Sequence, residues 1–154
     1  MKVSDIMTPA ALIDAPNDTL ADASARMWQQ QTGSLLVMDG DRLAGIVTER
    51  DLLKFVGEGG DPHSVKLTDV MTTDPVTVPA ETDIKDAAEI MFERWFRHLP
   101  VVDSNGKVVG IISLRDLLSL VARGIQDPEA LQSLIGHKLV RDARIERVEA
   151  GDLD

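Results

Sequence analysis

The sequence predicts a mixed α/β fold, of the α+β type, built from two copies of one small unit. The first observation is a repeat: SDIMT at residues 4–8 recurs as TDVMT at residues 68–72, an offset of 64 positions. The second is that GIVTERDLL at 45–53 recurs as GIISLRDLL at 110–118, after one extra residue within 104–107. The third is that stretches with the 3.6-residue period of a helix alternate with short β-branched stretches. Matches along two whole copies indicate a duplication.

Each copy is expected to begin with a short strand and a helix. The strand covers 11–14 in the first copy and 75–78 in the second, where Val76-Thr77-Val78 is β-branched and lies between two prolines. A helix follows, because apolar or small residues recur at i, i+3, i+4 and i+7. The two stripes are Leu20, Ala23, Ser24, Met27 and Ile84, Ala87, Ala88, Met91. The candidate N-caps are Asp18 or Thr19, and Thr82 or Asp83.

A hairpin and a second helix complete each copy. The hairpin strands are expected at 34–38 and 42–47, and at 99–102 and 107–112, around the turn sequences DGD and DSNG. The second helix begins at Arg50 or Arg115, with Thr48 or Ser113 as its natural N-cap. Each copy is therefore predicted to run strand, helix, strand, strand, helix.

The chain divides into two repeats, a linker and a tail. We expect the first repeat at 1–57, a glycine-rich linker at 58–63, the second repeat at 64–124 and a charged C-terminal tail at 125–154. One repeat of about 60 residues buries little apolar surface alone, so two repeats are expected to pack around a pseudo-twofold axis. The tail begins with a predicted short helix, 128–135. Its later basic and acidic residues fit either a solvated helix or an arm that docks on a partner.

Composition and charge exclude several classes of protein. The net charge of −10 argues against nonspecific binding of nucleic acid, which depends on cations that displace counterions from phosphates. No apolar run approaches the length of a membrane-spanning helix, and we expect no membrane insertion. The chain has no cysteine and its N-terminus does not resemble a signal peptide, so we expect a cytoplasmic protein.

The repeated G-h-h-[ST]-x-x-D motif, in which h is apolar, has the chemistry of an anion site. A buried strand leads there into a helix N-terminus, where unpaired N–H groups and the helix dipole attract anions. Thr48 offers a hydroxyl, Arg50 a guanidinium suited to phosphate, and Asp51 a carboxylate that can accept two ribose hydroxyls. Ser113, Arg115 and Asp116 repeat this arrangement in the second copy. The alternative is that these residues only cap their helices.

These motifs, taken in order and twice, resemble the CBS-domain family. The resemblance rests on the D-x-M-T openings, the G-h-h-[ST]-x-x-D closings and His98-Leu99-Pro100-Val101-Val102-Asp103, and it covers residues 1 to about 123. It implies a stand-alone pair of CBS repeats that binds an adenosine-type ligand such as AMP, ADP, ATP or S-adenosylmethionine. It also implies a homodimer that regulates an unidentified partner protein. The adenine nucleotide is then a regulatory ligand, and no cofactor is required. The rival interpretation is a ligand-free dimerisation or scaffold module.

By the same resemblance, two clefts are each built from both repeats, and we name them by their motif aspartates. The Asp51 cleft is expected to combine Ile46, Thr48, Arg50 and Asp51 with Met71, Thr72, Val76, Arg97 and His98. The Asp116 cleft is expected to combine Ile111, Ser113, Arg115 and Asp116 with Met7, Thr8, Leu12, Gly33 and Ser34. Because of Arg97 and His98, the Asp51 cleft is the more positive and suits a di- or triphosphate. The Asp116 cleft is roomier and more neutral, and suits AMP or an uncharged adenosine derivative.

The remaining chemically distinctive residues favour structural roles. His98 is expected to pack or to form hydrogen bonds rather than to act as a base, and the histidines at 63, 98 and 137 lack the spacing of metal ligands. Trp28, Trp95 and Phe96 are interpreted as core or interface residues in preference to a platform for stacking a base. No nucleophile–base pair or carboxylate dyad is apparent, so we expect no catalytic residue and no enzyme activity.

Overall fold

The computed structural model describes residues 1–9 and 11–122 and confirms an α+β fold with two sheets. The first half of the chain forms a 3₁₀ helix η1 (Val3–Asp5), β1 (Ile13–Asp14), α1 (Leu20–Gln30), β2 (Ser34–Asp39), β3 (Arg42–Thr48) and α2 (Glu49–Gly57). The second half forms α3 (Leu67–Val70), β4 (Thr72–Thr73), β5 (Val78–Pro79), α4 (Ile84–Arg94), β6 (His98–Val102), β7 (Val108–Ser113) and α5 (Leu114–Ala122). The predicted tail, 125–154, lies outside the described residues.

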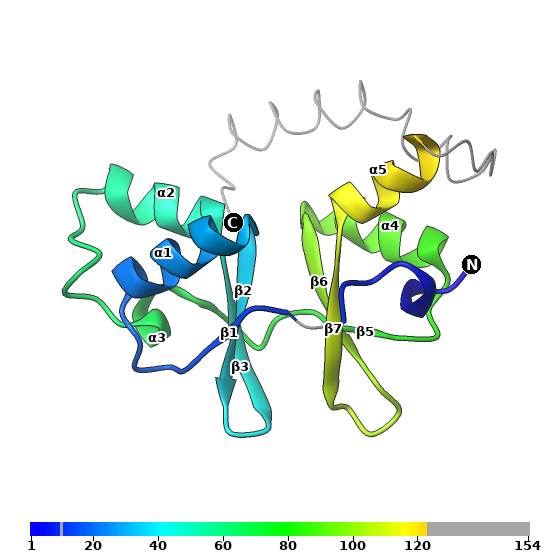
Figure 1. The fold of residues 1–154 in the computed structure, drawn as a ribbon, viewed down its shortest axis with the longest axis horizontal. Helices are drawn as coiled ribbons and strands as arrows, with labels where there is room; N and C mark the ends of the chain where they lie inside the picture. The colour runs from blue at the N-terminus through cyan, green and yellow to red at the C-terminus, as the bar shows by residue number, and fades with distance from the viewer. Residues whose placement is uncertain (10, 123–154) are drawn as a thin grey trace.

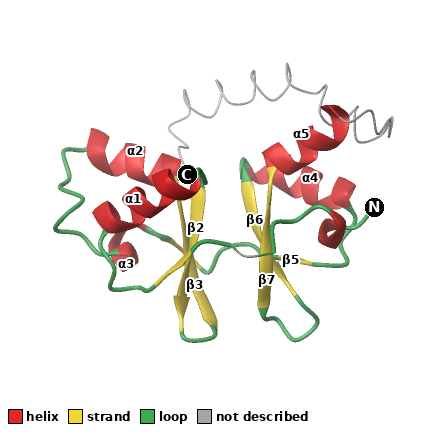
Figure 2. Cartoon of the chain, viewed as in Figure 1, coloured by secondary structure: helices red, strands yellow, loops and turns green. Residues whose placement is uncertain are grey.

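The two sheets have the same core topology. The strand orders are β1-β2-β3-β4 and β5-β6-β7. In each, a short first strand pairs in parallel with the next strand, which then forms an antiparallel hairpin with the third. The two hairpins lie side by side in the centre of the molecule, and the helix pairs α1–α2 and α4–α5 lie outside them (Figures 1 and 2). The pseudo-twofold relation predicted from the repeat is therefore visible in the arrangement.

The opening segment of each repeat packs on the opposite repeat. Val3 is fully buried in the core of the second sheet, and Leu67 is fully buried in the core of the first. The backbone of Thr8 exchanges two hydrogen bonds with Ile111 of β7, at 2.8 and 3.0 Å. In the corresponding place β4 pairs with β3, Thr72 opposite Ile46. The chain therefore crosses between the two halves twice, as the backbone trace in Figure 1 shows.

The capping predictions are confirmed, with small shifts of the helix starts. Thr19 and Asp83 are the N-caps of α1 and α4, and each side chain accepts a backbone N–H of the first turn. Thr48 is the N-cap of α2, and Ser113 immediately precedes α5. These two helices begin one residue before the predicted arginines, at Glu49 and Leu114.

Other predictions need correction. The helices η1 and α3, which end within the D-x-M-T motifs, and the pairing of β4 with β3 were not predicted, and the strands predicted at 11–14 and 75–78 are confined to Ile13–Asp14 and Val78–Pro79. Ser24 is only half-buried, and its Oγ donates to the carbonyl oxygen of Leu20 at 2.6 Å. Trp28 is 77% exposed and does not belong to the core. No helix among the described residues is long and apolar enough to cross a membrane.

An ion pair with a buried carboxylate and a partly exposed arginine distinguishes the first repeat from the second. Asp14 of β1 is 6% exposed, and its Oδ2 lies 2.6 Å from Nη2 of Arg26 on α1. The hydrogen bond to Asp14 raises the pKa of Arg26. The positions 64 residues later are Val78, which is fully buried, and Ile90, which packs against the second core. At the two equivalent positions, the second repeat therefore packs apolar side chains where the first repeat has an ion pair.

We predict that exchanging this pair for its apolar counterpart preserves or increases stability. The double variant Asp14→Val/Arg26→Ile should change the free energy of unfolding by between zero and about 4 kcal/mol in the stabilising direction, because desolvation offsets most of the attraction in a buried pair. Arg26→Ile alone should cost about 3–5 kcal/mol, because it leaves a buried carboxylate unpaired. Urea denaturation measures all three. A double variant less stable than the unmodified protein would contradict the account.

Candidate functional site

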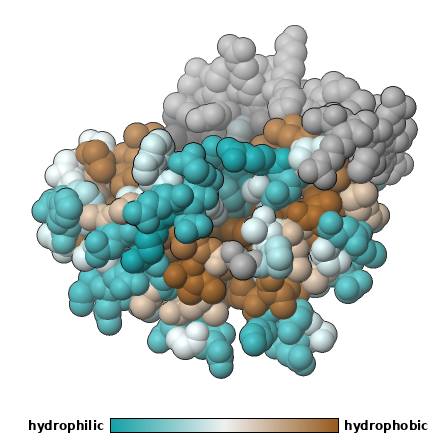
Figure 3. Space-filling model, viewed as in Figure 1, coloured by the Kyte–Doolittle hydropathy of each residue, from teal (hydrophilic) through white to brown (hydrophobic). Residues whose placement is uncertain are grey.

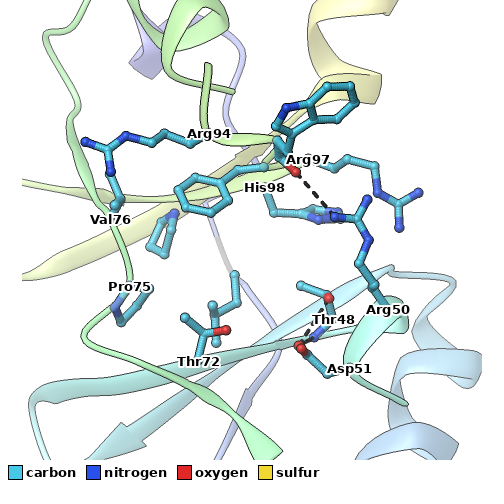
Figure 4. Close-up of a pocket in the computed structure, with 13 residues that line it drawn as sticks. Thr48, Arg50, Asp51, Thr72, Pro75, Val76, Arg94, Arg97 and His98 are labelled. Atoms are coloured by element: carbon cyan, nitrogen blue, oxygen red, sulfur yellow. Dashed lines mark hydrogen bonds between the residues drawn. The ribbon is translucent and has the colours of Figure 1, made fainter. Parts of the chain in front are cut away.

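The Asp51 cleft lies between the two repeats and draws its lining from three segments (Figure 4). The first repeat supplies the end of β3 and the start of α2, the chain after β4 supplies one wall, and the α4–β6 connection supplies the other. Of the predicted residues, the cleft is lined by Ile46, Thr48, Arg50, Asp51, Thr72, Val76, Arg97 and His98. Met71 does not line it, because Met71 packs against the first core and lies where a side chain on Gly45 would project.

The Asp116 cleft has the corresponding construction. It is lined by the predicted residues Thr8, Leu12, Gly33, Ser34, Ile111, Ser113, Arg115 and Asp116. Met7 is missing from the lining, because it packs against the second core. The structure therefore brings together sixteen of the eighteen candidate residues, eight in each cleft, and places the two methionines behind the walls.

Both motif aspartates serve as caps. In the first repeat, Oδ2 of Asp51 accepts the N–H of Thr48 at 2.7 Å and its hydroxyl at 3.1 Å. In the second, Oδ2 of Asp116 accepts the N–H and the hydroxyl of Ser113, both at 2.7 Å. Both motifs therefore cap their helices. This capping employs one oxygen of each carboxylate, and the other oxygen has acceptor sites of its own.

Two of the three arginines that line the Asp51 cleft are held by protein groups. Nη1 of Arg50 lies 3.4 Å from the backbone oxygen of Trp95, which is a contact across the cleft from the first repeat to the second. Nη2 of Arg97 lies 3.4 Å from Oε2 of Glu49. In Figure 4 the Arg97 side chain extends to the Arg50 side, away from Val76 and Pro75. Both arginines therefore tie the two repeats together at this edge.

The two clefts differ in charge and size as expected from the sequence. The Asp51 cleft contains three arginines and one carboxylate, and its volume is about 150 Å³. The Asp116 cleft contains two arginines and two carboxylates, and its volume is about 750 Å³. Part of the difference follows from one four-residue stretch, since Arg94-Trp95-Phe96-Arg97 in the second repeat corresponds to Gln30-Gln31-Thr32-Gly33 in the first. The second carboxylate of the Asp116 cleft is Glu49.

Several lining residues were missed by the sequence analysis. Trp95 and Phe96 are half-buried and line the Asp51 cleft, with Arg94 and Pro75 beside them. Trp95 is the C-cap of α4 with φ 60°, as Gln31 is the C-cap of α1 with φ 52°, so the two residues occupy equivalent backbone positions. Glu49 lines the Asp116 cleft. The alignment of the two repeats pairs these positions, but it does not reveal that they face a cleft.

His98 lies at the boundary of both clefts and is half-buried. Burial lowers the pKa of His98 below its usual value, and the nearby positive charge of Arg97 adds to this effect. Glu49 and Asp116 act in the opposite direction, and Arg115 lowers the pKa slightly. Within residues 1–9 and 11–122, no group of three His, Cys, Asp or Glu residues could hold a metal ion. His137 lies outside the described part of the chain.

We predict that His98 makes the protein less stable in mild acid. Its pKa is lower in the folded chain than in the unfolded chain, so the unfolded chain binds more protons below pH about 6.5. The associated stability is complete above that pH and is lost as the pH falls through the folded pKa. Urea denaturation at pH 7.5 and 5.5 should show a smaller loss for His98→Gln than for the unmodified protein. His63→Gln, at an exposed histidine, is the control, and equal losses in all three proteins would refute the prediction.

Comparison with known proteins gives the family. Residues 3–58 and 67–123 each match the family model described as the CBS domain. An uncharacterized 17.7 kDa protein of Acidianus ambivalens is 40% identical over 132 residues, which are 85% of this chain and 77% of the relative.

Two solved structures of CBS proteins in complex with AMP resemble this one. CBSX2 has a TM-score of 0.70 and 30% identity, with coverage of 81% of this chain and 98% of the other. PAE2072 of Pyrobaculum aerophilum has a TM-score of 0.70 and 27% identity, with coverage of 76% and 90%. Because the family model matches two consecutive segments that together span well over half of the chain, this protein belongs to the CBS-domain family.

Proposed function

We propose that this protein is a regulatory module that binds an adenosine-type ligand in the clefts between its repeats. The observation that supports this most strongly is the construction of each cleft. A helix N-terminus with a hydroxyl, an arginine and an aspartate faces a short apolar wall from the opposite repeat. The complexes of CBSX2 and PAE2072 with AMP show that related CBS proteins bind a ligand of this class.

Each cleft offers a group for each part of a nucleotide. In the Asp51 cleft, Ile46 and Val76 supply apolar contacts for the base, Asp51 accepts ribose hydroxyls, and Thr48 and Arg50 bind phosphate. In the Asp116 cleft, Ile111 and Leu12 contact the base, Asp116 accepts the ribose, and Ser113 and Arg115 bind phosphate.

The charges of the two clefts favour different ligands. The three arginines of the Asp51 cleft suit a di- or triphosphate, such as ADP or ATP. The balanced charges of the Asp116 cleft suit AMP or a less anionic adenosine derivative, such as S-adenosylmethionine. The ligand acts as a signal and not as a cofactor, and the module itself catalyses no reaction.

Ligand binding transmits a signal through packing. Both clefts are lined by both repeats, so a ligand that fits one relative placement better than another shifts the equilibrium between them. A regulated partner protein in the cytoplasm then senses the new arrangement.

The same proposal includes a homodimer formed through the outer helices. Trp28 on α1, Leu53 on α2 and Leu118 on α5 are 77%, 74% and 45% exposed, and Val56 is 51% exposed one turn after Leu53. Apolar residues are visible at the surface over α2 in Figure 3. Large exposed apolar side chains one turn apart on a helix, such as Leu53 and Val56, are more typical of an interface than of a solvated helix face. A second copy presents the same helices and can cover them.

We predict that each motif aspartate is needed for binding in its own cleft. Asp51→Ala and Asp116→Ala should each remove one AMP site, with at least a tenfold loss of affinity, because hydrogen bonds to a carboxylate contribute about 1.5–3 kcal/mol each. Isothermal titration calorimetry of the full chain measures the sites. Asp41→Ala, in the exposed turn of the first hairpin, is the control. Unchanged AMP affinity in both variants would overturn the ribose assignment. If no adenine compound binds or raises the melting temperature, the scaffold interpretation is favoured.

We predict that Leu53→Glu converts a dimer to a monomer at micromolar protein concentration. A buried, unpaired carboxylate in the middle of an apolar interface is strongly unfavourable. Sedimentation velocity measures the mass, and Lys54→Glu, at the next exposed position of α2, should remain dimeric. A monomeric unmodified protein, or a dimeric Leu53→Glu variant, would contradict the proposed interface.

A further inference from the structure

Arg97 belongs to both clefts. It lines the Asp51 cleft together with Arg50 and Arg94, and it also lines the Asp116 cleft. Its backbone explains this position, because the carbonyl oxygen of Arg97 accepts the N–H of Leu114 at the start of α5, at 2.9 Å. The Arg97 residue is therefore fixed at the boundary between the clefts, and its long side chain can serve only one of them at a time.

Glu49, which lines the Asp116 cleft, pairs with the Arg97 side chain and holds it at that cleft. Oε2 of Glu49 lies 3.4 Å from Nη2 of Arg97. The carboxylate also lies over Gly33, since a Cβ on that glycine would meet the Glu49 carboxyl carbon at 3.2 Å. Glu49 lines the Asp116 cleft, so its charge acts on any ligand there. When Arg97 is paired with Glu49, the charge that the Asp116 cleft presents is balanced.

The pair is weak enough to exchange. The side chains of Glu49 and Arg97 are 61% and 46% exposed, and exposed ion pairs contribute little to stability. A phosphate group accepts two parallel hydrogen bonds from a guanidinium, which is a stronger interaction than this single contact. A polyphosphate in the Asp51 cleft can therefore compete with Glu49 for Arg97.

The other side of the pseudo-twofold axis has no such pair. The equivalent of Glu49 is Leu114 and the equivalent of Arg97 is Gly33, although the backbone bond between them is the same, with Glu49 N–H donating to Gly33 at 3.0 Å. The ion pair is therefore an addition to the repeated architecture and not a part of it. No charge of this kind links the clefts at the symmetry-related place.

We infer that the Glu49–Arg97 pair couples the two clefts, so that a phosphate-bearing ligand in the Asp51 cleft weakens the binding of a second anionic ligand in the Asp116 cleft. The inference rests on the proposed function for the identity of the ligand. An anion in the Asp51 cleft draws Arg97 away from Glu49, and the unpaired Glu49 carboxylate, which lines the Asp116 cleft, then repels an anion bound there. An uncharged ligand such as adenosine has no phosphate that could compete with Glu49 for Arg97, and the Glu49 carboxylate does not repel it. Glu49 is thus the residue that selects against a second anion.

The experiment compares AMP with adenosine by isothermal titration calorimetry of the full chain. Asp51→Ala and Asp116→Ala each give the affinity of the remaining cleft with the other cleft empty. The product of the two stepwise association constants of the unmodified protein, divided by the product of these two single-cleft constants, gives the coupling between filled clefts. AMP should bind about fivefold more weakly in the filled state, the lower end of usual coupling, and adenosine equally in both. Glu49→Gln should abolish the difference for AMP, and Glu58→Gln, an exposed carboxylate beyond the end of α2, should retain it.

The outcomes separate this inference from the proposed function. AMP binding in both clefts without the fivefold difference, or with a difference that persists in Glu49→Gln, overturns the coupling and leaves the binding function intact. If AMP and adenosine do not bind, the proposed function fails, and tripolyphosphate then tests the ion pair by itself. It should bind several-fold more tightly to Glu49→Gln than to Glu58→Gln, because Arg97 no longer has to leave a carboxylate. Equal affinities for tripolyphosphate, or no binding, would overturn the inference.

Discussion

The close passage of each opening segment over the last strand of the other repeat is the constraint on which the rest of the structure depends. A Cβ on Gly110 would lie 2.6 Å from the carbonyl oxygen of Thr8, and one on Gly45 would lie 2.8 Å from that of Thr72. Only glycine leaves room for these contacts, since a backbone oxygen obstructs the added group at both positions and the Met71 side chain also obstructs it at Gly45. The passage brings Thr8 beside Ile111 and Thr72 beside Ile46, next to the two helix starts. Both clefts exist because of it.

The chemistry of the clefts then follows from the divergence of two copies that began alike. The capping motifs are nearly the same, since Thr48 and Asp51 repeat the contacts of Ser113 and Asp116. The α1–β2 and α4–β6 connections differ, and the second supplies aromatic rings and arginines where the first supplies glutamines and glycine. These side chains reduce the volume of one cleft and give it positive charge. Two repeats that share one backbone arrangement and differ in the connection before the hairpin are therefore sufficient to give two sites of different ligand preference.

Much of the fold could be predicted from the sequence, because local patterns determine it. The helix stripes from Leu20 and Ile84, the hairpins and the capping residues are all local signals, and the structure confirms them. The passage of η1 onto the opposite core could not be read from residues 3–5, because short openings have no periodicity of their own. The pairs Asp14–Arg26 and Glu49–Arg97 depend on contacts between distant segments or on side-chain direction, which spacing does not encode. For the same reason the motifs predicted most of the site, but not Trp95, Phe96 or Glu49.

The free energy of unfolding of glycine variants tests the central constraint most directly. Gly110→Ala and Gly45→Ala should each cost about 1–3 kcal/mol in urea denaturation, because a methyl group forces the crossing backbone to move. Gly57→Ala, at the end of α2 with no atom within 4 Å of the added group, should cost nothing. Each variant should still unfold in a single transition, since the openings tie both repeats into one unit. Full stability of Gly110→Ala and Gly45→Ala, or separate unfolding of the two repeats, would contradict this account.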